Sequence, residues 1–124
     1  SDSAGTSWLD TGKRAWNSDL LAATGLTMSQ MPSLVEGTEK AGTLRSAVAA
    51  ELGLPAGIAV AGGAGDNAAS ACGMGTVADG QAFASLGTSG VLFAANASYL
   101  PNPASAVHAF CHALPGTWHQ MGVI

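Results

Sequence analysis

The chain has 124 residues, of which 48% are hydrophobic and only 10% are charged. Because an average globular domain has about 25% charged residues, this chain offers too little polar surface for a free-standing domain, and we expect it to be a piece of a larger protein. Its net charge of −4 and the lack of any basic run beyond Lys13-Arg14 disfavour nucleic acid or an anionic membrane surface as a partner.

Short strands and short helices alternate in the first half of the sequence. Ser18 and Ser46 are candidate N-caps of two helices that Gly25 and Gly53 end, and Gly42 is expected to form a bulge or a bend. The predicted elements are a strand at residues 8–10, helices at residues 19–24, 29–31 and 46–52, and an extended edge at residues 40–44.

The run from Ile58 to Ala69 is the most informative stretch. Residues 58–61 are apolar and partly β-branched, which predicts a buried strand. Three glycines in the four residues 62–65 allow a tight turn and a close approach of the backbone to a ligand. Asp66 and Asn67 follow at the start of a predicted helix that continues to about Met74. A single carboxylate held in this way is suited to act as a general base.

Two other interpretations of this run are weighed. Asp66 is also a residue type that caps helices, although a cap alone does not require three glycines before it. Gly63-x-Gly65-x-x-Ala68 formally matches a dinucleotide fingerprint. Asp66 would then place negative charge where the pyrophosphate binds, and residues 80–124 contain no acid to hold a ribose. A dinucleotide site is therefore disfavoured.

Hairpins dominate the last third of the chain. Strands at residues 81–86 and 91–95 flank the turn Gly87-Thr88-Ser89-Gly90, and strands at residues 106–114 and 117–123 flank Pro115-Gly116. We therefore place a domain boundary near residues 75–80. Backbone amides of the first turn could bind phosphate oxygens, although an ordinary tight turn uses the same residue types.

Neither a membrane anchor nor a metal site is predicted. No apolar stretch reaches the ~20 residues that cross a bilayer, and no signal peptide is visible. His108 and His112 would share one strand face while Cys111 lies on the other, so these residues and His119 do not form a zinc site. Cys72 and Cys111 lack CxxC spacing, and we expect both to be reduced and buried, as in a cytoplasmic protein.

The motifs together resemble the middle of the FGGY family of carbohydrate kinases. The matching stretches are residues 8–10, 30–32 with 36–37, 62–69, 85–91 and 100–118. The Gly-Asp-Asn element and the Leu-Gly-Thr-Ser-Gly turn are shared across many sugar kinases of the family. The segment 100–116 is similar to the xylulokinases in particular.

This resemblance implies an α/β fold with two actin-like, ribonuclease H-like domains and an active site in the cleft between them. Residues 1–78 would be the end of the N-terminal domain, and residues 79–124 the first hairpins of the C-terminal domain. Asp66 falls on the catalytic base of the family, Asn67 on a sugar contact, and Gly87, Thr88 and Ser89 on the phosphate-binding hairpin.

The implied reaction transfers phosphate from ATP, with Mg²⁺ bridging its phosphates, to D-xylulose, giving D-xylulose 5-phosphate. We expect this reaction of the intact, cytoplasmic parent protein and not of these 124 residues alone. The parent could be a homodimer. Three alternatives remain. The parent could phosphorylate ribulose, gluconate or glycerol, it could be a non-catalytic actin-like sugar- or nucleotide-binding module, or the segment could be purely structural.

Overall fold

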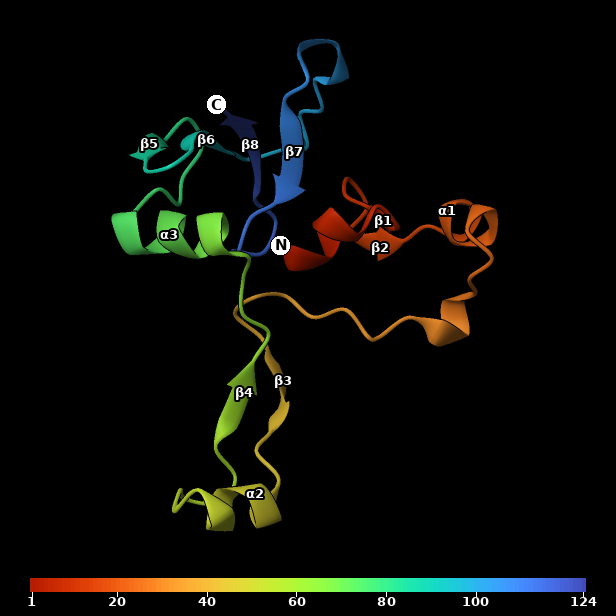
Figure 1. The fold of residues 1–124 in the computed structure, drawn as a ribbon, viewed down its shortest axis with the longest axis vertical. Coiled ribbons are helices and arrows are strands. Elements are labelled where there is room, and N and C mark those ends of the chain that lie inside the picture. Colours follow the sequence, from red (N-terminus) through yellow and green to blue (C-terminus); the bar gives the residue numbers. More distant parts are fainter.

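The computed structural model describes residues 1–124. Its elements form three parts, which are residues 1–30, residues 40–61 and residues 66–124 (Figure 1). The helices, with 3-10 helices written η, are η1 (Asp2–Thr6), α1 (Ser18–Ala23), η2 (Met28–Gln30), α2 (Ser46–Glu51), α3 (Asp66–Met74) and η3 (Pro103–Ser105). The strands are β1 (Leu9–Asp10), β2 (Ala15–Trp16), β3 (Lys40–Thr43), β4 (Ala59–Ala61), β5 (Ala82–Leu86), β6 (Gly90–Asn96), β7 (His108–Cys111) and β8 (Trp118–Val123). No helix has the length and apolar character that crossing a membrane requires.

The main sheet contains four antiparallel strands in the order β5-β6-β8-β7. Both hairpins predicted from the sequence are therefore confirmed. Helix α3 packs on one face of this sheet, where Ala71 joins Phe83, Phe93 and Ala95 in the apolar core. The opposite face is open, and Leu92 on it is 56% exposed. The core thus lies between α3 and the sheet.

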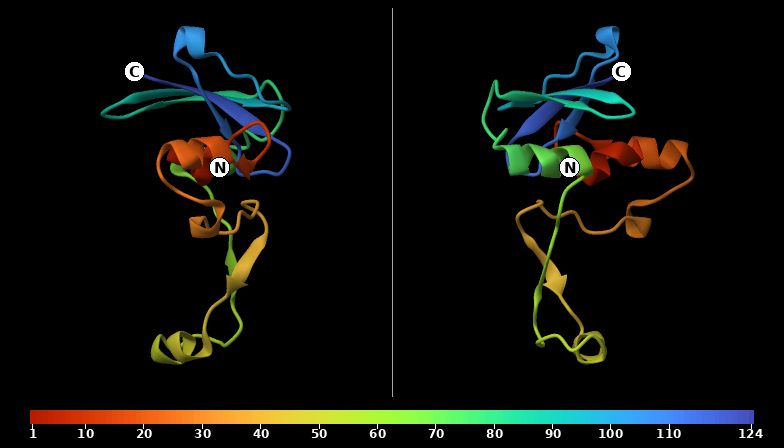
Figure 2. Two further views of the ribbon diagram at one scale, coloured as in Figure 1. Left: turned by 90° about the vertical axis from the view of Figure 1, so that its right-hand side faces the viewer. Right: turned by 60° about the vertical axis from the view of Figure 1, so that its left-hand side comes forward.

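The ribbon of β3 and β4 extends away from the rest of the chain and carries α2 at its far end (Figures 1 and 2). Its register shifts between Lys40 and Gly42, which confirms the bulge predicted at Gly42. The prediction of a buried strand at residues 58–61 is wrong, because all of β4 is exposed and Val60 is 45% exposed. An apolar run indicates burial only where another layer covers it, and β4 pairs with β3 alone.

Three smaller predictions are also corrected. Asn17, not Ser18, caps α1, because its Oδ1 accepts hydrogen bonds from the amides of Asp19 and Leu20 at 2.9 and 3.1 Å. Ser46 is the first residue of α2, and Arg45 before it makes no side-chain cap. Cys72 is exposed, whereas Cys111 is buried as expected.

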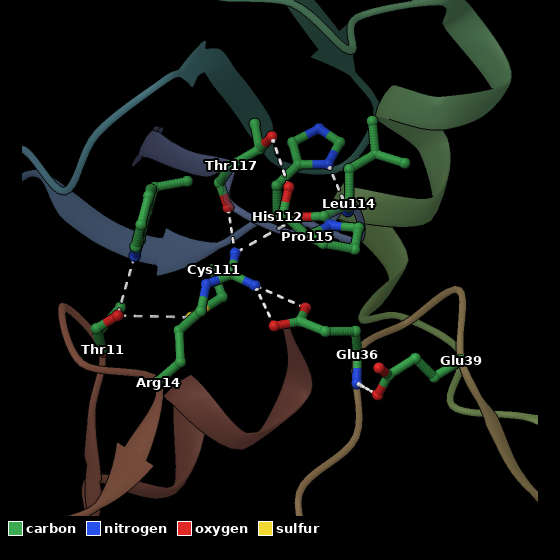
Figure 3. A network of polar contacts seen from close by, with 10 residues as sticks. Thr11, Arg14, Glu36, Glu39, Cys111, His112, Leu114, Pro115 and Thr117 are labelled. Carbon is green, nitrogen blue, oxygen red and sulfur yellow. Dashed lines mark hydrogen bonds and ion pairs between the residues drawn. The ribbon is translucent and has the colours of Figure 1, made fainter.

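Arg14 connects segments that are far apart in the sequence (Figure 3). Its guanidinium donates to the Glu36 carboxylate, with Nη1–Oε1 at 2.7 Å, and to the carbonyl oxygens of Thr117 and Leu114. The same group lies 4.8 Å from the ring centre of Trp118, a cation–π distance. Arg14 adopts a positive φ of 55°, which a non-glycine residue rarely does without compensating contacts. One side chain therefore holds the N-terminal segment, the Glu36 loop and the β7–β8 hairpin together.

We predict that Arg14→Ala lowers the free energy of unfolding by about 2 kcal/mol, because it leaves the partly buried Glu36 carboxylate without its charged partner. Chemical denaturation measures this loss. Lys13→Ala is the matched control, because the Lys13 side chain is 80% exposed in its ion pair with Asp10 and should contribute much less. Equal losses in the two variants would contradict the role given to Arg14.

Candidate functional site

Asp66 is the first residue of α3, and one of its carboxylate oxygens is free. Gly65 occupies the N-cap position, so the interpretation of Asp66 as the N-cap is wrong. Oδ1 of Asp66 accepts from the backbone amide of Asn67 at 2.8 Å and from its side-chain amide at 3.2 Å. These contacts leave Oδ2 to accept a hydrogen bond or a proton from a bound molecule, as a general base must.

The glycines before Asp66 lie where the chain crosses its own 36–39 loop at close range. The amide of Gly62 donates to the carbonyl of Glu39 at 2.9 Å, and that of Gly63 to the carbonyl of Gly37 at 3.1 Å. A Cβ atom on Gly62 would lie only 2.4 Å from the Glu36 carbonyl oxygen. The close backbone approach predicted for these glycines is thus real, but at Gly62 and Gly63 its partner is the 36–39 loop.

A hollow of about 140 Å³ lies beside the start of α3. It combines the first residues of the chain, the α3 N-terminus and the inner face of β7 and β8. Gly65 belongs to its wall, and the Gly65 amide donates to the Ser1 hydroxyl at 2.9 Å. The lining residues are Ser1, Asp2, Gly5, Gly65, Asp66, Asn67, Ala68, Phe110, His119 and Met121. The two residues predicted to touch the sugar therefore share one hollow.

His119 is the buried titratable group in the wall of this hollow. Its side chain stacks on Phe93 with ring centres 4.2 Å apart. Burial, and secondarily the charge of the nearby His112, lowers the pKa of His119 from 6.5 to about 4. The imidazole is therefore neutral at pH 7, with one nitrogen that donates and one that accepts.

The side chain of His112, in contrast, forms hydrogen bonds within the protein through both ring nitrogens. It is fully buried, and its Nε2 lies 3.1 Å from the carbonyl oxygen of Thr76. Its Nδ1 accepts from the amide of Leu114 at 3.3 Å, so Nε2 carries the proton that bonds to Thr76. Burial lowers the pKa of His112 as well. No three His, Cys, Asp or Glu side chains come together as metal ligands in the chain.

The turn Gly87-Thr88-Ser89 lies at the tip of the β5–β6 hairpin, apart from the hollow. Gly90 exchanges backbone hydrogen bonds with Ile124 at 2.8 Å, and Ile124 is three residues beyond Met121 of the hollow. That interval is about 10 Å along a strand. The hollow and the turn are thus separate features of one sheet.

Several lining residues were not predicted from the sequence. Ser1, Asp2, Phe110 and Met121 carried no motif, and His119 was considered only for zinc. A signal for two of them exists, because His119 and Met121 are two residues apart on one strand and must share a face. What the sequence could not indicate is that α3 begins opposite that face.

Comparison with known proteins identifies the wider group. Residues 1–73 match the sequence model of the FGGY family of carbohydrate kinases, N-terminal domain. The whole chain is 51% identical to the xylulose kinase of Klebsiella pneumoniae and 53% identical to that of Escherichia coli (strain K12), covering 26% and 25% of those proteins. The chain therefore spans about a quarter of the length of these curated relatives.

Solved structures agree with this result. The fold superposes on the crystal structure of a xyloylose kinase from Brucella ovis with a TM-score of 0.96 and 74% identity, over 100% of this chain and 26% of that one. The xylulose kinase from Rhodospirillum rubrum gives a TM-score of 0.85 at 28% identity, over 94% of this chain and 23% of that one. The α/β sugar-kinase fold expected from the sequence is thereby confirmed.

We predict that Gly62→Ala lowers the free energy of unfolding by about 1–3 kcal/mol, because the new methyl group meets the Glu36 carbonyl. Gly73→Ala is the matched control. A Cβ there meets nothing within 4 Å, and alanine in a helix should raise stability by about 0.5–1 kcal/mol. Thermal denaturation compares the two, and an unchanged or raised melting temperature for Gly62→Ala would refute the crossing.

The lowered pKa of His119 predicts a pH dependence of stability. Below pH 6.5 the unfolded chain takes up a proton on His119, whereas the folded chain does so only near pH 4. The free energy of unfolding should therefore fall as the pH decreases from about 6.5 to about 4. Urea denaturation across this range should show wild type losing stability relative to His119→Phe. A difference between the two that does not vary with pH would contradict a neutral, buried His119.

Proposed function

The chain belongs to the FGGY family of carbohydrate kinases, and from this membership we propose that the protein containing it transfers the γ-phosphoryl group of ATP to D-xylulose. The observation that carries the proposal is the identity of 51% and 53% to two xylulose kinases over the full length of this chain. The products would be ADP and D-xylulose 5-phosphate.

Asp66 is the proposed general base. Its free Oδ2 would accept the proton of the attacking sugar hydroxyl while the hydroxyl oxygen forms a bond to the γ-phosphorus. The bond from that phosphorus to the β,γ-bridging oxygen breaks, and ADP leaves with its electron pair. Little covalent chemistry is required of the protein, since positioning and charge stabilisation provide most of the catalysis of phosphoryl transfer. The rigid start of α3 is suited to such positioning.

Asn67 and the β5–β6 turn have supporting roles in this proposal. The Asn67 amide, which already contacts Asp66 at 3.2 Å, would orient the carboxylate and bind a sugar hydroxyl. The amides of Gly87, Thr88 and Ser89 would bind phosphate oxygens of ATP. The proposed domain boundary after residue 78 would fall between α3 and β5. Because both elements contribute to one apolar core, the base and the turn would be held in one fixed arrangement.

Bound Mg²⁺ would neutralise charge on the ATP phosphates. Asp2 lines the hollow beside Asp66, and its carboxylate is the kind of oxygen ligand that this ion prefers. Because no three potential ligand side chains of the chain come together, phosphate oxygens and water would supply most of the coordination.

We predict that Asp66→Asn in the full-length protein lowers kcat for D-xylulose by about 10²–10⁴, since an amide cannot accept the proton. KM for the sugar should change little. ADP release with D-xylulose, D-ribulose, gluconate and glycerol measures turnover and identifies the substrate. Asp19→Asn is the control, because Asp19 lies on α1 outside the hollow. An unchanged kcat in Asp66→Asn would mean that Asp66 is only the first residue of a helix. If the wild type shows no turnover and Asp66→Asn no longer binds the sugar, a non-catalytic binding module is favoured.

A further inference from the structure

His119 stands out among the buried polar groups of the chain. Two side-chain nitrogens are enclosed with no hydrogen-bond partner, Nε of Arg14 and Nδ1 of His119. Arg14 satisfies its other nitrogens through Glu36 and backbone carbonyls, whereas His119 has no comparable partner although it is only 4% exposed. A buried polar side chain without a partner destabilises the fold and requires an explanation.

The His119 ring is fixed in orientation by aromatic packing. It stacks on Phe93 at 4.2 Å with an angle of 21° between the rings, and it lies 5.7 Å from Phe110. Strand register places His119 opposite Ala95 on one side and Phe110 on the other. A ring held on both sides cannot rotate freely toward a protein partner elsewhere, so its polar atoms stay directed at their present surroundings.

Those surroundings include the hollow that contains Asp66 and Asn67. Since Nδ1 is enclosed, Nε2 is the nitrogen left to reach a molecule in the hollow. The neighbouring walls, Phe110 and Met121, are apolar and suited to the C–H face of a sugar, whereas Asp66 and Asn67 are suited to its hydroxyl groups. A polyol hydroxyl can donate to or accept from a neutral imidazole.

We propose that His119 is a substrate-binding residue of the Asp66 hollow, with Nε2 forming a hydrogen bond to a hydroxyl group of the bound polyol. The inference rests on the proposed function and adds a contact from β8 to those from α3. His119 and Asp66 then hold the sugar from opposite sides, one on the sheet and one on the helix. The substrate would thus give Nε2 a hydrogen-bond partner, while Nδ1 stays enclosed without one.

The test uses the full-length protein and two substitutions of His119. His119→Phe keeps the stacking on Phe93 but removes the hydrogen bond, and it should raise KM for D-xylulose about tenfold, with KM for ATP within about twofold, as expected of a sugar contact. His119→Gln places an amide nitrogen near the position of Nε2 and should recover part of the affinity. His108→Phe is the matched control, because His108 also packs on Phe110, at 5.5 Å, but does not line the hollow.

A direct measurement separates binding from folding. Addition of D-xylulose without ATP should shift the imidazole NMR signals of His119 and leave those of His108 in place. Wild-type turnover with an unchanged sugar KM in His119→Phe would overturn this inference alone. A parallel rise in the KM values for sugar and ATP, with no recovery in His119→Gln and no shift on sugar addition, would also overturn it. A wild-type protein that phosphorylates none of the sugars would overturn the proposed function itself.

Discussion

The ion pair between Arg14 and Glu36 is the constraint on which the arrangement of the other parts depends. It fixes the 36–39 loop against the N-terminal segment, and the same guanidinium holds the carbonyls of Leu114 and Thr117. The fixed loop crosses Gly62 too closely for a side chain there, and it accepts a hydrogen bond from the Gly63 amide. Three residues later the chain begins α3 with Asp66. The ion pair between Arg14 and Glu36 therefore holds the loop that crosses the chain just before the helix that carries the proposed base.

The hollow owes its chemistry to this long-range arrangement. Its walls come from the first residues of the chain, the start of α3, and strands β7 and β8, which lie more than a hundred residues from the N-terminus. One wall offers a carboxylate with a free oxygen, and the facing wall offers a neutral imidazole among apolar side chains. This combination would suit a hydroxyl compound better than an anion, whose charge Asp66 would repel.

Local signals in the sequence predicted much of the fold. The two hairpins, the helix beginning at Asp66 and the bulge at Gly42 follow from turn residues, periodicity and backbone freedom, which act over a few neighbouring residues. The exposure of β4 and the contacts of Arg14 could not be predicted, because both depend on what packs against a residue from far along the chain. For the same reason Asp66 and Asn67 were predicted as site residues whereas His119 was not. A glycine run marks the former, and only the packing of α3 against the sheet brings the latter beside them. Even local prediction is limited where two neighbouring residues are both good caps. Asn17 and Ser18 are such a pair, and in the structure the helix is capped by Asn17.

The central claim is that Asp66 acts on a sugar hydroxyl in a site completed by the β5–β6 turn. A crystal structure of the full-length protein with D-xylulose and a non-hydrolysable ATP analogue tests it most directly. We expect the Asp66 carboxylate within hydrogen-bond distance of the hydroxyl that faces the γ-phosphate, with the amides of Gly87 to Ser89 on phosphate oxygens. A sugar bound away from Asp66, or phosphates that do not contact the turn, would contradict the account.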